Sequence, residues 1–157
     1  MTRIFLHGLD SSSKGNKARY FQTNFANMMT PDFTGDLTNR LARLREILQE
    51  TGELILVGSS FGGLMAAIYA IENPERVRRL ILLAPALNFP DFSAWQGRTC
   101  PVPAFLFIGR QDTVTPADPV VAAARAVFPS LSVNLLDDDH LLAKSFQQLD
   151  WPALLEI

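Results

Sequence analysis

Short apolar runs of strand length alternate with longer segments of helical periodicity along the chain. Three of these runs show no polar alternation, which is typical of strands buried on both faces of a parallel sheet. Two further runs and one brief extended piece complete the set, so we predict about six strands. The segments are residues 3–7, 29–33, 53–58, 79–85, 104–109 and 131–136.

Segments with helical spacing separate the predicted strands. Asp36 has the position of an N-cap, and Gly52 has the C′ position at which a helix often ends. Thr115 and Pro116 have the pattern of a cap residue followed by proline at the first helical position. We predict helices over residues 16–28, 37–51, 61–71, 116–128 and 141–149.

The regular alternation of strands and helices predicts the fold class. It favours a single α/β domain over residues 1–157, built as a three-layer αβα sandwich around a mostly parallel sheet. The length suits one domain with a core of its own.

Composition and charge narrow the functional classes. The net charge is −2 and the sequence pI is about 5.6, so no basic stripe suggests a nucleic acid or an anionic membrane as partner. The first apolar run is too short for a signal peptide, and no run reaches membrane-spanning length. We therefore expect a cytoplasmic protein without membrane insertion. Cys100 is the one cysteine and only two histidines are present, so we expect neither an intramolecular disulfide nor a structural zinc site.

Polar residues with catalytic potential follow several of the predicted strands. In parallel sheets, ligands and chemistry lie at the carboxyl ends of the strands. Ser60, Asp112 and His140 each follow a different predicted strand, in this order along the chain, and His7 follows the first strand. We therefore expect these side chains at one edge of the sheet.

The stretch VGSSFGG predicts a nucleophile elbow between a buried strand and a helix. A sharp strand-to-helix turn forces its central residue into an unfavourable backbone conformation, and its neighbours must be nearly bare of side chain. Gly58 and Gly62 lie two residues before and two residues after Ser60, whereas Ser59 lacks glycine at both places. Ser60 is therefore the predicted nucleophile.

Two other interpretations of this stretch compete with the elbow. A phosphate-binding loop would need Lys followed by Ser or Thr after the last glycine, and a dinucleotide fingerprint would need G-x-G-x-x-G; neither pattern is present. A serine-rich tight turn without chemistry is the remaining alternative, and the residues at the other strand ends argue against it.

A serine hydroxyl needs a base that removes its proton, and the base needs an acid that orients it. His140 follows the last predicted strand, where an imidazole can lean over the elbow. Asp112 is the favoured acid because it follows the next-to-last strand. Asp91 is a second candidate for the acid, and Asp139 is disfavoured as the sequence neighbour of His140.

The loop after the first predicted strand has a different expected role. It can present a backbone N–H toward Ser60, and Leu9 is the predicted donor. Together with the N–H of Phe61, this donor would form an oxyanion hole. For His7 and Gly8 we favour a role in shaping this turn over a role of His7 as the base.

The motifs HGLDSS, GSSFGG, GRQDTVTP and DDDH, in this order, resemble an α/β-hydrolase over almost the whole chain. The short form is most similar to the small bacterial YqiA-type esterases, and SSSKGNKA is also similar to small thioesterase-like hydrolases. The resemblance implies a Ser60–Asp112–His140 triad, oxyanion donors at Leu9 and Phe61, acyl-enzyme chemistry and no cofactor.

The chain departs from many relatives of this family. It begins directly at the strand before the HG motif, and the connection after residues 79–85 is too short for a cap domain. An open site is therefore expected. Phe89, Phe92 and Trp95 in this connection either line an acyl pocket or pack the connection onto the sheet, and both readings stay open.

The predicted function is that of a serine hydrolase that cleaves carboxylic ester or thioester bonds of small acyl substrates through an acyl-enzyme on Ser60. One alternative is a non-catalytic ligand-binding or signalling protein that keeps the fold. Another is a peptidase or a C–C hydrolase that uses the same triad. The sequence determines neither the substrate nor the oligomeric state.

Overall fold

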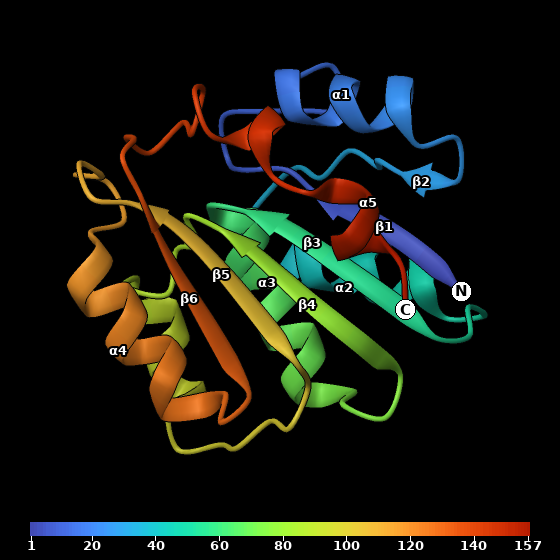
Figure 1. Cartoon of the computed structure of the whole chain (residues 1–157). Coiled ribbons are helices and arrows are strands. Elements are labelled where there is room, and N and C mark those ends of the chain that lie inside the picture. Colours follow the sequence, from blue (N-terminus) through green and yellow to red (C-terminus); the bar gives the residue numbers. More distant parts are fainter.

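Six parallel strands form one sheet in the computed structural model, which describes all 157 residues (Figure 1). Each neighbouring pair of strands is parallel, and the strand order is β2-β1-β3-β4-β5-β6. The predicted α/β fold with about six mostly parallel strands is therefore confirmed. The strands are β1 (Thr2–Leu6), β2 (Met28–Met29), β3 (Leu54–Ser59), β4 (Val77–Leu83), β5 (Ala104–Gly109) and β6 (Leu131–Leu136).

Helices lie on both faces of this sheet. Figure 1 shows α1 and α5 on the side facing the viewer, and α2 and α3 behind the strands. None of the helices has the length and hydropathy that crossing a membrane requires. The helices are α1 (Asn16–Asn24), α2 (Leu37–Leu48), α3 (Phe61–Glu72), α4 (Ala117–Val127) and α5 (Trp151–Leu155), with 3-10 helices η1 (Pro90–Trp95) and η2 (Phe146–Gln148).

The central strands are apolar on both faces because each face meets its own helix layer. Leu54 and Leu56 of β3 belong to the larger core cluster, with α2, α3 and α4. Ile55 and Val57 of the same strand belong to a second cluster, with α1 and α5. Successive side chains of a strand point to opposite faces. This explains why the run at residues 53–58 shows no polar alternation.

The connection between β4 and β5 contains only η1 and no inserted domain. Phe92 is fully buried in the larger core cluster, so this ring packs the connection onto the sheet and is not free to line a substrate pocket. Phe89 and Trp95 are partly buried against the same cluster. The open site expected from the short connection is therefore consistent with the fold.

Helix α2 ends earlier than predicted, and Gly52 is not its C′ residue. The helix ends at Leu48, and Gly52 does not adopt a positive φ. The carbonyl oxygen of Leu48 instead accepts hydrogen bonds from the Arg76 guanidinium (2.6 Å) and the Thr51 hydroxyl (2.8 Å). These side chains satisfy the last turn without a left-handed glycine.

The predicted helix over residues 141–149 is wrong. The chain forms a loop there, followed by η2 at Phe146–Gln148, and α5 begins only at Trp151. The Asp138 carboxylate binds the backbone N–H groups of Lys144 and Ser145, at 3.0 and 2.9 Å, and so holds them in the loop. The apolar spacing had suggested a helix, but these bonds compete with helical hydrogen bonding.

Candidate active site

Ser60 occupies the turn between β3 and α3 with φ 55° and ψ −115°. This conformation is uncommon for a residue other than glycine and costs about 1–3 kcal/mol. The surrounding backbone holds it in place: the Ser60 N–H donates to Leu83 O (3.0 Å), and Ser60 O accepts from the N–H groups of Gly63 (3.0 Å) and Ala86 (2.9 Å). The strained elbow predicted from the glycine spacing is therefore the geometry that this turn has.

The glycines around Ser60 are required by close backbone approach. A Cβ at Gly58 would overlap the backbone of Gly62, and a Cβ at Gly62 would overlap the carbonyl oxygens of Leu6 and His7. Backbone atoms of a central strand cannot move away cheaply, so neither position accepts a side chain. The end of β1 and the start of α3 are thereby packed directly against each other.

Ser60, His140 and Asp112 form a continuous chain of hydrogen bonds. Ser60 Oγ lies 3.0 Å from His140 Nε2, and His140 Nδ1 lies 2.8 Å from Asp112 Oδ2. The Asp112 side chain is fully buried, whereas the His140 side chain keeps 20% of its surface exposed. The acid is thus shielded from water, and the imidazole borders the open side from which a substrate can approach.

Four donors satisfy the buried Asp112 carboxylate. Oδ1 accepts the backbone N–H groups of Val114 (2.9 Å) and Thr115 (2.8 Å). Oδ2 accepts the Thr115 hydroxyl (2.8 Å) and faces His140 Nδ1. A buried charge is tolerated only with such partners. With Asp112 as the acceptor, His140 carries its proton on Nδ1, which leaves Nε2 free to accept from Ser60.

Thr115 is a site residue that the sequence reasoning missed. The sequence pattern predicts Thr115 as the cap of the next helix, but Pro116 occupies the N-cap position of α4. The Thr115 hydroxyl lies instead beside Asp112 and His140. The spacing of three residues between Asp112 and Thr115 was the available signal, because an aspartate at such a turn bonds backbone N–H groups two and three residues ahead.

The other two candidate acids lie elsewhere. Asp91 is exposed on η1 and makes no contact with His140. Asp139 Oδ1 accepts the backbone N–H of Leu141 at 3.0 Å, so it organises the loop next to His140 and does not bind the ring. Of the three aspartates considered, Asp112 alone is within hydrogen-bonding distance of the imidazole.

The loop after β1 lies against Ser60. A Cβ at Gly8 would be 3.4 Å from the Ser60 Cβ, which shows how closely this loop approaches the elbow. The backbone N–H of Leu9 donates to no protein acceptor. Phe61 is the first residue of α3, where a helix offers N–H groups without an intrahelical partner. Both N–H groups remain the predicted oxyanion donors.

His7 is buried and both of its ring nitrogens bind backbone groups. His7 Nε2 accepts the N–H of Phe33 (3.0 Å), so Nδ1 carries the proton that donates to Gly8 O (2.7 Å). Asp32, one residue before Phe33, accepts the N–H and the hydroxyl of Ser13. The hydrogen bond from the Ser13 backbone N–H contributes most and the one from its hydroxyl contributes next, and together they hold the pKa of Asp32 below its usual value. The segment at residues 32–33 thereby fixes both ends of the loop that contains Leu9.

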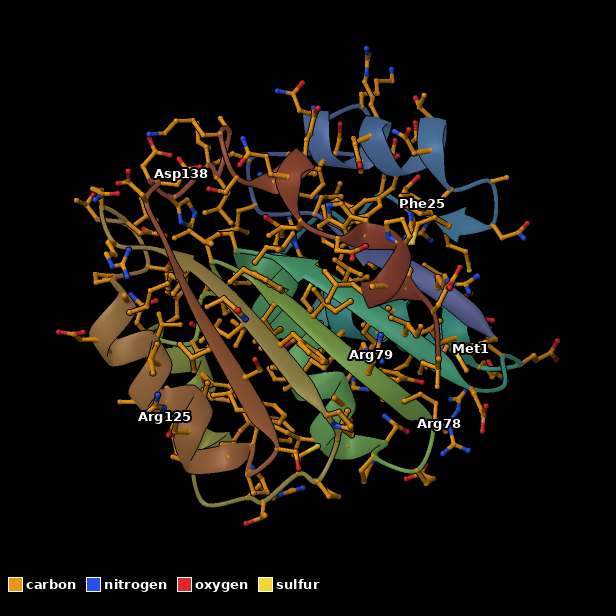
Figure 2. All side chains as sticks on the ribbon, in the orientation of Figure 1. Met1, Phe25, Arg78, Arg79, Arg125 and Asp138 are labelled. Carbon is orange, nitrogen blue, oxygen red and sulfur yellow. The ribbon has the colours of Figure 1, made fainter.

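The loop that contains His140 is built around Asp138, which Figure 2 labels at the end of β6. Asp138 is buried and accepts N–H groups from Asp139, Lys144 and Ser145. Burial opposes its ionisation, but these hydrogen bonds outweigh burial and hold the pKa of Asp138 below its usual value. Lys17 of α1 donates to Leu141 O (2.7 Å) and so ties this loop to the helix layer.

Asp138→Asn is expected to destabilise the fold by roughly 2 kcal/mol at pH 7, because an amide NH₂ would face backbone donors. The lowered pKa means that the stabilisation by the carboxylate is present above the unfolded-state pKa and is lost as pH falls through the folded-state value. Urea unfolding should therefore give a difference in the free energy of unfolding between wild type and variant that is smaller at pH 3 than at pH 7. Asp137→Asn is the control, since Asp137 is exposed and its substitution should leave the free energy of unfolding unchanged. An equal difference between wild type and Asp138→Asn at both pH values would contradict the role of the ionised Asp138 carboxylate.

Comparison with known proteins shows the family to which this fold belongs. Over residues 8–101 it matches the family model described as alpha/beta hydrolase fold, a match that includes Ser60 and ends before Asp112. A segment of 36 residues is 58% identical to 2-hydroxymuconate semialdehyde hydrolase from Pseudomonas sp. (strain CF600), covering 22% of this chain. The chain spans only 13% of that relative's length and 8% of the length of another curated relative.

Solved structures extend the similarity over nearly the whole chain. A structure assigned to the hydrolases of the alpha/beta superfamily, from Xanthomonas campestris pv. campestris, is 28% identical with a TM-score of 0.75, and the match covers 94% of this chain and 92% of that one. A structure assigned as a hydrolase from Agrobacterium vitis S4 is 19% identical with a TM-score of 0.83, covering 99% and 88%. A monoacylglycerol lipase from Paleococcus ferrophilus is 14% identical with a TM-score of 0.76, covering 98% and 93%.

The family model covers more than half of the chain, and the strand order, the elbow at Ser60 and the similar structures agree with it. These solved structures share the fold, and the resemblance to YqiA-type esterases stays a prediction. The chain belongs to the alpha/beta hydrolase fold family.

Proposed function

We propose that this protein is a serine hydrolase that cleaves carboxylic ester or thioester bonds of small acyl substrates. The observation that carries the proposal is the hydrogen-bonded chain from Ser60 through His140 to the buried Asp112, with Ser60 on a strained turn. A strained backbone at a nucleophile position is retained where it serves the chemistry. The relatives support hydrolysis in general, and the choice of ester or thioester bonds rests on the resemblance to small esterases, because the same triad can also cleave peptide and C–C bonds.

In the proposed reaction, Ser60 Oγ attacks the acyl carbon while His140 Nε2 accepts its proton. The N–H groups of Leu9 and Phe61 would bind the oxyanion of the tetrahedral intermediate. His140 then gives the proton to the departing alcohol or thiol, which leaves an ester on Ser60. Water attacks this ester with His140 again as base, and the acid leaves with Ser60 restored. The triad provides the nucleophile, base and acid that these steps require.

The surroundings of the triad favour an acyl group that lies partly in solvent. Leu9, Val114 and Leu141 belong to three loops that carry or adjoin the proposed machinery, and their side chains are 46%, 53% and 66% exposed. Two surface cavities of about 220 and 350 Å³ lie away from the triad and are lined by none of its residues. A shallow site with an apolar rim suits small apolar acyl groups better than a long chain that needs a closed tunnel.

A fluorophosphonate probe on the wild type, Ser60→Ala and Ser59→Ala tests the proposal. We expect labelling of the wild type and of Ser59→Ala, and no labelling of Ser60→Ala, because the probe needs an activated serine. Ser59 is the matched control since it is the adjacent hydroxyl in the same turn. Equal labelling of Ser60→Ala and wild type would overturn the proposal. A p-nitrophenyl ester series of increasing acyl length would then define the preferred substrate.

The remaining expectations about the cellular setting stay predictions. They are the cytoplasmic location, a small-molecule acyl ester or thioester as substrate, no binding of nucleic acid or a cofactor, and no membrane insertion. The non-catalytic reading of the fold is decided by the same probe experiment, because a protein that only binds its ligand would not be labelled at Ser60.

A further inference from the structure

The hydroxyl of Thr115 lies among three polar atoms of the candidate active site. Its Oγ1 is 2.8 Å from Asp112 Oδ2, 3.0 Å from His140 Nδ1 and 3.2 Å from Ala84 O. Thr115 is fully buried, so water does not compete for these contacts. A threonine hydroxyl has one proton and can donate it to only one acceptor at a time, either Asp112 or Ala84.

Ala84 supplies a second, independent observation at this place. It follows β4 with φ 43°, a left-handed conformation that is costly for alanine by about 1–3 kcal/mol. Its N–H donates to Phe107 O (2.8 Å), which holds the residue against β5, and its carbonyl oxygen is the one near Thr115. The end of β4 is thus strained where it meets the Thr115 hydroxyl.

We propose that Thr115 is a positioning residue that shares Asp112 Oδ2 with the imidazole and thereby sets the basicity of His140. The inference rests on the proposed function, since it assigns Asp112 and His140 the roles of acid and base. A hydroxyl that donates to the carboxylate takes up part of its negative charge. The carboxylate then attracts the imidazolium less strongly, and His140 stays neutral, and able to act as a base, at a lower pH. Ala84 O holds the hydroxyl oxygen from the other side.

Removal of the Thr115 hydroxyl should make the His140 imidazole more basic. Thr115→Val keeps the shape and removes the donor, so the full carboxylate charge acts on the imidazolium and stabilises it. The other charged groups around His140 are Asp138 and Asp139 on its own loop, and Lys17 of α1, which donates to Leu141 O of that loop. None of them changes in the variant. Because the Thr115 side chain is fully buried, a valine in its place changes the solvent exposure of the His140 imidazole little.

Histidine NMR titration tests the inference directly, because the chain has only two histidines. We expect the His140 titration midpoint to rise by about half a pH unit or more in Thr115→Val and to return toward wild type in Thr115→Ser, which keeps a hydroxyl. His7 serves as the internal reference and should not move. Thr51→Val is the matched control, since it also loses a partly buried hydroxyl bond, to Leu48 O, far from the triad. Thr115→Ala provides a second hydroxyl-free variant in case valine impairs folding.

Kinetics gives a second readout that a merely structural residue would not change. In Thr115→Val the acid limb of kcat/KM should move to higher pH by about half a unit, so that kcat/KM at a fixed pH on that limb falls about threefold. A His140 midpoint that is equal to wild type, or lower, in both hydroxyl-free variants would overturn the inference. This outcome is separate from failure of the proposed function, which Ser60→Ala labelling decides, because the titration needs no turnover.

Discussion

His140→Gln is expected to lower kcat by roughly 10⁵-fold, because one imidazole performs both proton transfers of acylation and both of deacylation. Its Nε2 lies 3.0 Å from Ser60 Oγ, and no other titratable side chain is bonded to this hydroxyl. Glutamine keeps a polar group of similar length but cannot accept and return the proton near neutral pH. Steady-state hydrolysis of p-nitrophenyl acetate, with unfolding measured in parallel, checks the prediction.

The control for this prediction is His7→Gln, the other histidine of the chain. His7 bonds Phe33 N–H and Gly8 O, so its loss should appear mainly as reduced stability and as a moderate loss of rate through the loop that contains Leu9. Turnover by His140→Gln within tenfold of wild type would show that His140 is not the base. A larger loss in His7→Gln than in His140→Gln, with both variants folded, would transfer the role to His7.

Asp112→Asn is expected to lower kcat by roughly 10⁴-fold with little change in KM. The amide cannot satisfy all its neighbours: its NH₂ would face either His140 Nδ1 or the backbone N–H groups of Val114 and Thr115. In the first case the imidazole must take the wrong tautomer, with its proton on Nε2 toward Ser60. The pH profile of kcat/KM for the variant, measured with the same ester, reports this loss.

Asp91→Asn separates the two acids that the sequence left open. Asp91 is exposed on η1 and should tolerate the change with turnover within about twofold of wild type. If Asp91→Asn lost activity while Asp112→Asn kept it, the bond between Asp112 and His140 would have no catalytic meaning. Loss of activity in both Asp91→Asn and Asp112→Asn would point to a rearrangement of the connection between β4 and β5 during the reaction.

Features encoded by neighbouring residues could be predicted from the sequence. The strands β3, β4 and β5 stand out because each contains an uninterrupted run of apolar residues, as a strand segment buried on both faces requires. The choice of Ser60 over Ser59 follows from glycine spacing, since the overlap that excludes side chains at Gly58 and Gly62 occurs within and beside the turn. The positions of Asp112 and His140 follow from the rule that parallel strands share a carboxyl edge.

Features that depend on contacts between distant residues could not be predicted in this way. The end of α2 at Leu48 depends on Arg76, which lies 28 positions later, and not on the nearby Gly52. The role of Thr115 depends on His140, 25 positions later, and on Ala84, 31 positions earlier. A threonine before a proline has the same local pattern whether it caps a helix or binds a catalytic acid.

Sequence patterns are sufficient to predict the α/β fold class, the strained turn at Ser60 and the strand ends that carry Asp112 and His140. Periodicity and glycine spacing encode these features because they arise from local backbone geometry and from burial. The tertiary structure alone decided that Asp112 and not Asp91 meets the imidazole, that Thr115 joins them, and that Asp138 replaces a helix with a loop. Each of these outcomes depends on a hydrogen bond within about 3 Å, and such distances are set only when the strands have been brought together in the sheet.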